Sequence, residues 1–275
     1  MSSLTGSNEV FQRRLLLDPD PAAWADAPVL LMAACDSAFL GHAVALARSL
    51  ELFSPGQHLL VHLVNPGDGE IARLEQLAAQ LESTRLHVSA EQVSLPGGQD
   101  PRPYYASARF LRMAELLAAR PGVPLFALDA DVLAVSPMEL DFSDKPEAEI
   151  CLIRRDLEGP VEEHMRVAAG AVWARNTVRA AAFMQAVADD LRKAFDDGSA
   201  AWFIDQLVLA KHMLAATGGA QVRNMKSKFS NWDMSDSALF WTGKGDRKYY
   251  DVRYLLLQEA LAEEPARRRA ARDLH

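Results

Sequence analysis

The decisive stretch of this sequence reads Leu125-Phe126-Ala127-Leu128-Asp129-Ala130-Asp131-Val132-Leu133. Its first four residues form a short, continuous apolar run, which is typical of a strand buried on both faces of a parallel sheet. Two carboxylates, Asp129 and Asp131, follow that run directly. Ligands of open parallel sheets bind at the carboxyl ends of the strands, so the stretch predicts a ligand site at these two aspartates.

Working outward, the same kind of apolar run recurs between segments with helical spacing. Further strands are predicted upstream at residues 29–34, 59–64 and 86–88, and downstream at 150–153 and 171–174. Helices are predicted at residues 43–50, 70–82, 107–119, 178–195 and 203–216. Strands that alternate with helices predict an α/β fold with a mostly parallel, doubly wound sheet.

Composition and charge narrow the range of functions that the chain can have. The chain has 275 residues, of which 49% are hydrophobic, enough for one large α/β domain. Its 37 acidic residues outnumber its 29 basic residues, for a net charge of −8. Because a protein that neutralises several phosphates normally carries a basic face, this balance disfavours nucleic acid as a substrate.

Cysteine usage and hydropathy indicate the compartment. Cys35 and Cys151 each lie in an apolar segment, which is typical of buried thiols in a reducing compartment. The N-terminus lacks the pattern of a signal peptide, and no apolar run approaches the ~20 residues that span a bilayer. We therefore expect a cytoplasmic protein without a transmembrane segment.

The spacing of Asp129 and Asp131 has three interpretations. Two carboxylates that converge at a strand end repel each other unless a cation lies between them, and Mg²⁺ or Mn²⁺ prefers such oxygen ligands. An ion there would stabilise a departing diphosphate. Alternatively, the aspartates make only local hydrogen bonds at a strand-to-turn transition.

The third interpretation is a haloacid-dehalogenase-like phosphatase, which also uses an Asp-x-Asp motif. That chemistry needs a second acidic pair to hold Mg²⁺, and the sequence offers Asp189 and Asp190. These two lie inside an amphipathic helical segment rather than at a strand end. The phosphatase motif also usually follows the first strand, whereas three predicted strands precede it here. We therefore rank the phosphatase below the diphosphate-binding metal site.

The chain resembles retaining GT-A glycosyltransferases of the glycogenin and bacterial lipopolysaccharide galactosyltransferase type (glycosyltransferase family 8-like) over residues 29–250. The segments that carry the resemblance are, in chain order, Ala33-Ala34-Cys35-Asp36, Ala108-Arg109-Phe110, Asp129-Ala130-Asp131, Ala168-Ala169-Gly170-Ala171-Val172, Asp205-Gln206 and Thr242-Gly243-Lys244-Gly245-Asp246-Arg247-Lys248.

The resemblance implies a role for each matching residue. It implies a donor-binding set comprising Ala34, Asp36, Ser37, Arg109, Asp129, Ala130, Gly170, Gly245 and Lys248. It implies that Asp205 and Gln206 orient the donor sugar and that, with Asp131, they form the catalytic set. It also implies that Asp129 and Asp131 bind Mn²⁺ or Mg²⁺, with Thr242 at the position of the family's metal-binding histidine. A hydroxyl is a poorer metal ligand than imidazole.

The function implied is hexosyl transfer, with retention, from a nucleotide-sugar, most simply a UDP-sugar. The acceptor would be a glycan, a protein or a small molecule. An alternative is a degenerate GT-A domain that binds a nucleotide-sugar without turnover, for which Thr242 and Ala168 are the motivating departures.

Composition and the resemblance together suggest the domain organisation. An N-terminal arm (residues 1–28) would precede a single catalytic domain (29–255), with a nucleotide half (29–135) and an acceptor half (136–255). A C-terminal helical tail (256–275) would follow. Its basic run at 267–272 is interpreted as a solvated helix, with contact to an anionic membrane surface as the alternative.

Overall fold

An eight-stranded mixed sheet organises the computed structural model, which describes residues 10–119, 122–138, 146–155 and 162–272, with side chains as far as 264. The strand order is β1-β4-β3-β2-β5-β8-β7-β9. The strands are β1 (Gln12–Leu17), β2 (Leu30–Cys35), β3 (His58–Val64), β4 (Arg85–Ser94), β5 (Leu125–Leu128), β7 (Ile150–Arg154), β8 (Val167–Ala174) and β9 (Val222–Asn224). Four of the seven neighbouring pairs are parallel, so the predicted parallel character of the sheet is confirmed.

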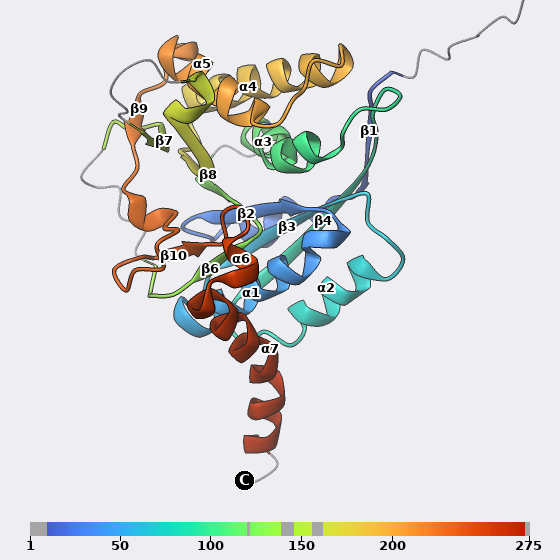
Figure 1. Ribbon diagram of the computed structural model, residues 1–275, viewed down its shortest axis with the longest axis vertical. Coiled ribbons are helices and arrows are strands. Elements are labelled where there is room, and N and C mark those ends of the chain that lie inside the picture. The colour runs from blue at the N-terminus through green and yellow to red at the C-terminus, as the bar shows by residue number, and fades with distance from the viewer. Residues whose placement is uncertain (1–9, 120–121, 139–145, 156–161, 273–275) are drawn as a thin grey trace, which may run out of the picture.

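Helices cover both faces of the sheet, as Figure 1 shows. One face carries α1 (Leu40–Phe53) and α2 (Glu70–Ala78), and the other carries α3 (Arg102–Ala119), α4 (Val178–Asp196) and α5 (Ile204–Leu214). Successive residues of β2 therefore enter different cores: Leu30 and Met32 pack with the core under α3 and α4, whereas Leu31 and Ala33 pack with the core under α1. This two-sided burial explains why the apolar runs are continuous.

A second, two-stranded sheet follows the aspartate stretch directly. In it β6 (Val132–Ala134) pairs antiparallel with β10 (Phe240–Thr242). The pairing brings the segment around residue 242 back beside Asp131, more than a hundred residues earlier in the chain. Immediately after β10 come a short helix, α6 (Arg247–Tyr250), and the long helix α7 (Val252–Arg272).

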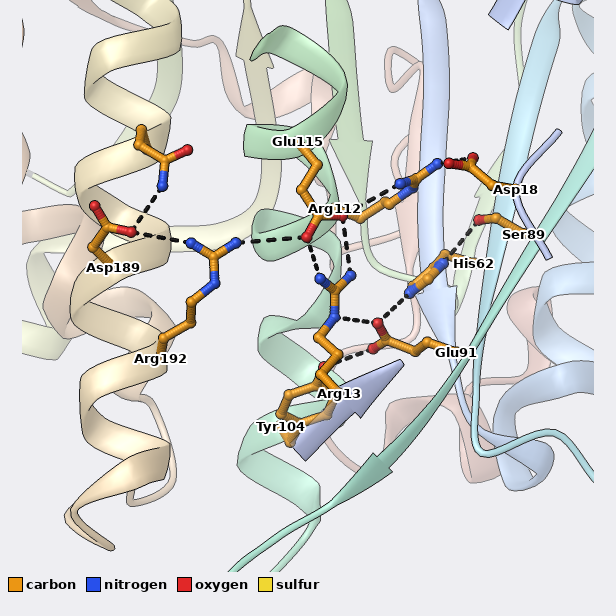
Figure 2. Close-up of polar contacts among 11 residues, drawn as sticks. Arg13, Asp18, His62, Ser89, Glu91, Tyr104, Arg112, Glu115, Asp189 and Arg192 are labelled. Carbon is orange, nitrogen blue, oxygen red and sulfur yellow. Dashed lines mark hydrogen bonds and ion pairs between the residues drawn. The ribbon is translucent and has the colours of Figure 1, made fainter. Parts of the chain in front are cut away.

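The N-terminal segment differs from its prediction as an arm outside the domain. Residues 12–17 form β1, which pairs antiparallel with β4 and extends the sheet. Arg13 of β1 forms ion pairs with Glu91 of β4 and Glu115 of α3, and these attach the strand to the interior (Figure 2). The described part of the predicted arm therefore belongs to the domain.

The C-terminal helix begins at Val252, four residues before the predicted tail. Leu261 of α7 is buried, and its carbonyl accepts a hydrogen bond from Arg48 of α1. The first part of this helix thus packs against the domain. The basic side chains at 267–272 lie outside the described residues. Among the described residues, no helix combines the length and apolar composition needed to cross a membrane.

Candidate functional site

A pocket of about 440 Å³ opens where β2 and β5 end. These neighbouring strands are parallel, so their carboxyl ends meet at the same edge of the sheet. The predicted site residues that line the pocket are Ala34, Asp36, Arg109, Asp129, Ala130, Asp131, Gly170, Asp205, Gln206, Thr242, Gly245 and Lys248. Of the predicted set, Ser37 alone is absent from this lining.

Ser37 lies just beyond the end of β2 and faces another partner. Asp36 caps the short 3₁₀ turn at residues 37–39 by accepting a hydrogen bond from the backbone N–H of Phe39. Within that turn, the Ser37 hydroxyl donates to Glu70 at the start of α2, at 2.8 Å. The turn therefore holds Asp36 at the pocket and Ser37 beside it.

Arg109 of α3 links the two halves of the pocket. Its guanidinium Nη2 lies 2.8 Å from Oδ1 of Asp129 and 3.5 Å from Oδ2 of Asp205. The same nitrogen donates to the backbone carbonyl of Ala169, at 3.1 Å. One buried arginine thus joins α3, the end of β5, strand β8 and the start of α5.

Burial raises the pKa of both carboxyl groups beside Arg109. For Asp205, loss of hydration raises the pKa to about 6, and the arginine's charge opposes this rise. For Asp129, the same loss of hydration raises the pKa, with Arg109 opposing the rise and Asp131 reinforcing it. The loss of hydration thus favours the protonated, uncharged form of both groups.

Gly170 of β8 allows the Asp129 carboxylate to lie against the strand. A Cβ at residue 170 would lie 2.6 Å from Oδ2 of Asp129, closer than real Cβ contacts. The backbone N–H of Asp129 also donates to the carbonyl of Gly170, at 3.1 Å. A glycine is thus needed here because of close packing against a carboxylate.

Asp131 is held by its backbone and by a lysine. Its carbonyl accepts hydrogen bonds from the Tyr254 hydroxyl, at 2.8 Å, and from the backbone N–H of Gly243, at 3.0 Å. Its carboxylate Oδ2 lies 2.6 Å from Nζ of Lys248 on α6. Gly245 precedes α6 with a φ of 62°, a conformation that favours glycine, and so permits the turn that delivers this lysine.

Gln206 and Thr242 face the pocket but use their polar groups internally. In the orientation that satisfies its neighbours, the Gln206 amide donates to the carbonyl of Val167 at 2.6 Å and to that of His164 at 3.1 Å. The Thr242 hydroxyl is buried and lies 3.1 Å from the Ser230 hydroxyl. The Gln206 amide nitrogen and the Thr242 hydroxyl are therefore bound to neighbouring residues of the protein, and both side chains help to hold the pocket wall in place.

The predicted Mn²⁺ or Mg²⁺ site stays a prediction, and the local charges do not favour it. One or two carboxylates with substrate phosphates can be enough for Mg²⁺, so ligand number alone does not decide. However, Asp129 and Asp131 each already hold a cationic side chain, and a divalent ion between them would be repelled by both. Among the described residues, no cluster of three or more His, Cys, Asp or Glu suits a metal ion.

Several pocket residues lie outside the predicted site set, among them Arg155, Trp202, Phe203, Trp232 and Lys244. Arg155 directly follows the apolar strand β7, a signal of the same kind that identified Asp129. Trp202 and Phe203 precede the helix that carries Asp205, and both rings are partly exposed, by 55% and 37%. Trp232 lies in a loop, without a sequence signal that distinguishes it from a core aromatic.

The second acidic pair on which the phosphatase interpretation depends, Asp189 and Asp190, lies away from the pocket. Asp189 on α4 accepts hydrogen bonds from Gln185 and Arg192, and Asp190 from Lys211 and His212. Neither aspartate lines the pocket. The two carboxylates therefore bind neighbouring helical side chains and are not placed to hold a metal beside Asp129.

Comparison with known proteins places the fold but not the family. No protein-family model matches the sequence, and no curated protein matches it. The structure is similar to the glycosyltransferase GlyE of Streptococcus pneumoniae, with a TM-score of 0.54 and 15% identity over 86% of this chain. It is also similar to the galactosyltransferase LgtC in complex with donor and acceptor sugar analogues, with a TM-score of 0.54 and 15% identity over 84% of this chain and 96% of LgtC.

A third similar structure is the bifunctional glycosyltransferase WbbM, with a TM-score of 0.55 and 13% identity over 83% of this chain. The chain spans 60% of the length of GlyE and 47% of that of WbbM. At such low identities these likenesses concern the fold alone. Together with the mixed sheet and its flanking helices, they show that the chain has a GT-A fold, as the sequence predicted.

Proposed function

We propose that this protein is a glycosyltransferase that moves a sugar from a nucleotide-sugar donor to an acceptor. The observation that carries the proposal is the pocket at the ends of β2 and β5 of this GT-A fold. Its lining brings together the side chains of Asp36, Arg109, Asp129, Asp205 and Lys248. Its volume of about 440 Å³ is within the usual range for small-molecule sites. Fold alone does not assign function, so the chemistry of the lining must support the assignment.

We assign the donor's three parts to three regions of the pocket. The nucleoside would lie beside Ala34 and Asp36, at the end of β2. The diphosphate would lie beside Gly245 and Lys248, where an ammonium group meets a glycine turn without a side chain in the way. The donor sugar would lie beside Arg109 and Asp205, because a buried carboxylate and a guanidinium are suited to hold sugar hydroxyls.

In this proposal the bond between the anomeric carbon and the diphosphate oxygen breaks, and the departing diphosphate gains negative charge. Cationic groups held in place before the reaction stabilise that charge without reorganising. The acceptor hydroxyl then bonds to the anomeric carbon, and its proton passes to the departing diphosphate oxygen. Retention at the anomeric carbon and the use of UDP-sugars rest on the sequence resemblance, and we keep both as part of the proposal.

The partly exposed rings of Trp202 and Phe203 support a carbohydrate acceptor. Phe203 also stacks on His164, with ring centroids 4.6 Å apart and planes only 5° from parallel. Aromatic faces at a pocket rim offer the flat, apolar surface on which one face of a sugar ring can pack. We therefore place the acceptor on the side of the pocket formed by the segment before α5.

Donor hydrolysis tests the proposal. Purified protein is incubated with a panel of UDP-, GDP- and CDP-sugars, and nucleotide release is measured alongside phosphate release. We expect one donor to release its nucleotide and Asp205→Asn to lower that rate by about 100-fold, because the donor sugar loses a positioning carboxylate. The matched control Asp189→Asn, an exposed carboxylate of α4, keeps the rate.

The outcomes separate the alternatives. Release of inorganic phosphate from simple phosphate esters would instead support the phosphatase. Binding of a nucleotide-sugar without turnover, with or without acceptor sugars, would support the degenerate domain. Absence of both binding and turnover across the panel would contradict the assignment of this pocket to any nucleotide-sugar.

A further inference from the structure

Some cationic side chains that line the pocket are not paired with a carboxylate among the described residues. Arg109 is paired with Asp129 and Asp205, and Lys248 is paired with Asp131. Three further cations line the same pocket: Arg102, which is paired with Asp100, and Arg155 and Lys244. Among the described residues, neither Arg155 nor Lys244 forms an ion pair with a carboxylate.

Arg155 and Lys244 lie around one aromatic ring. The Lys244 ammonium is 4.4 Å from the ring centroid of Trp232, and the Arg155 guanidinium carbon is 5.3 Å from it. Within the described part of the chain, Nε and Nη2 of Arg155 are buried without a hydrogen-bond partner. Unpaired buried donors of a charged group are costly, so this guanidinium is short of an anion.

The electrostatics of the two side chains agree with this geometry. Burial lowers the pKa of Lys244, and the nearby charge of Arg155 lowers it further. Burial also lowers the pKa of Arg155. Two like charges held together in a partly dehydrated pocket repel each other, and a bound anion would relieve both the repulsion and the loss of hydration.

Lys248 already provides a positive charge beside Asp131, where a divalent metal would otherwise bind. Its ammonium lies 2.6 Å from the Asp131 carboxylate, and the Asp129 carboxylate is likewise taken by Arg109. The position implied for a third metal ligand is Thr242, whose buried hydroxyl lies against Ser230. Charge and ligand chemistry therefore both disfavour a divalent ion at this pair.

We propose that the pocket binds the donor's diphosphate with Lys248, Lys244 and Arg155, without a divalent metal. This inference rests on the proposed function, since it names the groups that hold that donor. Lys248 provides the charge next to Asp131 that a metal would otherwise provide, and Asp131 positions the lysine. Arg155 supplies charge from the end of β7, and Lys244 supplies it from the turn between β10 and α6.

Calorimetric titration of the responsive donor, in excess EDTA and in excess Mn²⁺, tests the inference. We expect wild-type protein to bind with the same affinity in both buffers, within about threefold. In EDTA, Lys248→Ala, Lys244→Gln and Arg155→Gln should each weaken binding by about tenfold, as expected for the loss of one charge-assisted contact. Lys193→Gln, an exposed lysine of α4 outside the pocket, is the matched control and should bind as wild type does.

A second measurement uses Mn²⁺ alone as the probe. Electron paramagnetic resonance reports free Mn²⁺ directly, so wild-type protein in molar excess should leave the free-ion signal unchanged. Thermal unfolding of each variant shows whether it is folded. Lys244→Gln and Arg155→Gln remain informative if Lys248→Ala does not fold, because both side chains contact Trp232, which lies outside the strands and helices.

The failures are distinguishable. Donor binding that appears only with Mn²⁺ would overturn the metal-free inference and leave the proposed function standing. Binding in EDTA that none of the three substitutions weakens would also overturn the inference, because other groups would then hold the diphosphate. If no donor binds in either buffer, the proposed function itself fails.

Discussion

Helix α3 contributes one arginine to each of two buried clusters of charged side chains, and these clusters differ in what surrounds them. The pocket cluster comprises Arg109, Asp129, Asp131, Asp205 and Lys248. The closed cluster comprises Arg13, His62, Glu91, Tyr104, Arg112 and Glu115, and lies between β1, β3, β4 and α3 (Figure 2). Arg109 and Arg112 are three residues apart, yet they face different surroundings.

Each arginine and glutamate of the closed cluster has an oppositely charged partner, although Nε2 of His62 and Nε of Arg112 lack a hydrogen-bond partner among the described residues. The side chains of Glu91 and His62 are fully buried, with Nε2 of His62 3.2 Å from Oε2 of Glu91. The Tyr104 hydroxyl donates to the other Glu91 oxygen at 2.7 Å, and Ser89 contacts the second ring nitrogen of His62 at 2.8 Å. This Ser-His-Glu arrangement is sealed from solvent, so it has no access for a substrate.

The pocket cluster, by contrast, opens onto a cavity. The side chain of Asp129 is 33% exposed, and Arg155 beside the cluster has buried donors without partners among the described residues. Burial of charge is costly unless every group is paired. A cluster whose charges are paired and whose centre is sealed therefore supports the fold, whereas a cluster that opens onto a cavity beside cations unpaired in the described part of the chain marks the place for a ligand.

We expect the largest effect from a substitution that breaks the closed cluster. Glu91→Gln removes the charge that pairs with Arg13 and His62, and we expect it to lower the free energy of unfolding by about 3 kcal/mol. Urea denaturation measures the loss, with Asp189→Asn as an exposed control that should change stability by less than about 0.5 kcal/mol. Donor turnover per folded molecule should stay within about twofold of wild type.

The pH dependence of that variant sharpens the test. Burial on its own would raise the pKa of Glu91, but the hydrogen bond and charge of His62 and the charge of Arg13 lower it below its ordinary value of 4.5. A carboxyl whose pKa is lowered by folding stabilises the fold above its unfolded pKa, and this stabilisation is lost as the pH falls through the folded pKa. The deficit of Glu91→Gln should therefore shrink below pH 4.5; a constant deficit would contradict the role of the charge.

The second effect compares the two arginines of α3. Arg109→Lys keeps the charge but cannot reach Asp129, Asp205 and the Ala169 carbonyl together, so we expect donor turnover to fall by about 100-fold. Arg112→Lys should leave turnover within about threefold while lowering stability, because Arg112 pairs with Asp18 and Glu115 away from the pocket. Equal losses of turnover in both variants would contradict the separation of the clusters.

The smallest effect tests the position of one carboxylate. In Gly170→Ala, the new methyl group would displace Asp129, and we expect donor turnover to fall by about tenfold. Gly41→Ala is the matched control, because a Cβ there meets no atom within 4 Å. If Gly170→Ala turns over as fast as wild type, then the placement of the Asp129 carboxylate does not matter to the reaction.

Most of the sheet could be predicted because its strands are buried on both faces. Residues 29–34 and 59–64 read as uninterrupted apolar runs, and they form β2 (Leu30–Cys35) and β3 (His58–Val64). Strand β1 could not be predicted in this way. It lies at the sheet edge with Arg13 and Arg14, and its partner β4 lies about eighty residues away, so neither local pattern nor spacing indicates the pairing.

In the candidate site, as in the sheet, local patterns predict some residues, whereas contacts between distant segments are not visible in the sequence. Asp129 and Asp131 follow an apolar strand, and such a position is visible in the sequence. The contacts of Arg109 with Asp129 and Asp205, and of Lys248 with Asp131, join segments that lie from about twenty to more than a hundred residues apart. Only the resemblance brought these segments together beforehand. The charge balance that includes Arg155 and Lys244 required the folded structure.

A crystal structure of the protein with the responsive nucleotide-sugar tests the central claim most directly. We expect the nucleoside beside Asp36, the diphosphate against Lys244 and Lys248, and the sugar beside Arg109 and Asp205. A nucleotide-sugar bound outside this pocket, or a pocket without ligand density at a saturating concentration, would contradict the account.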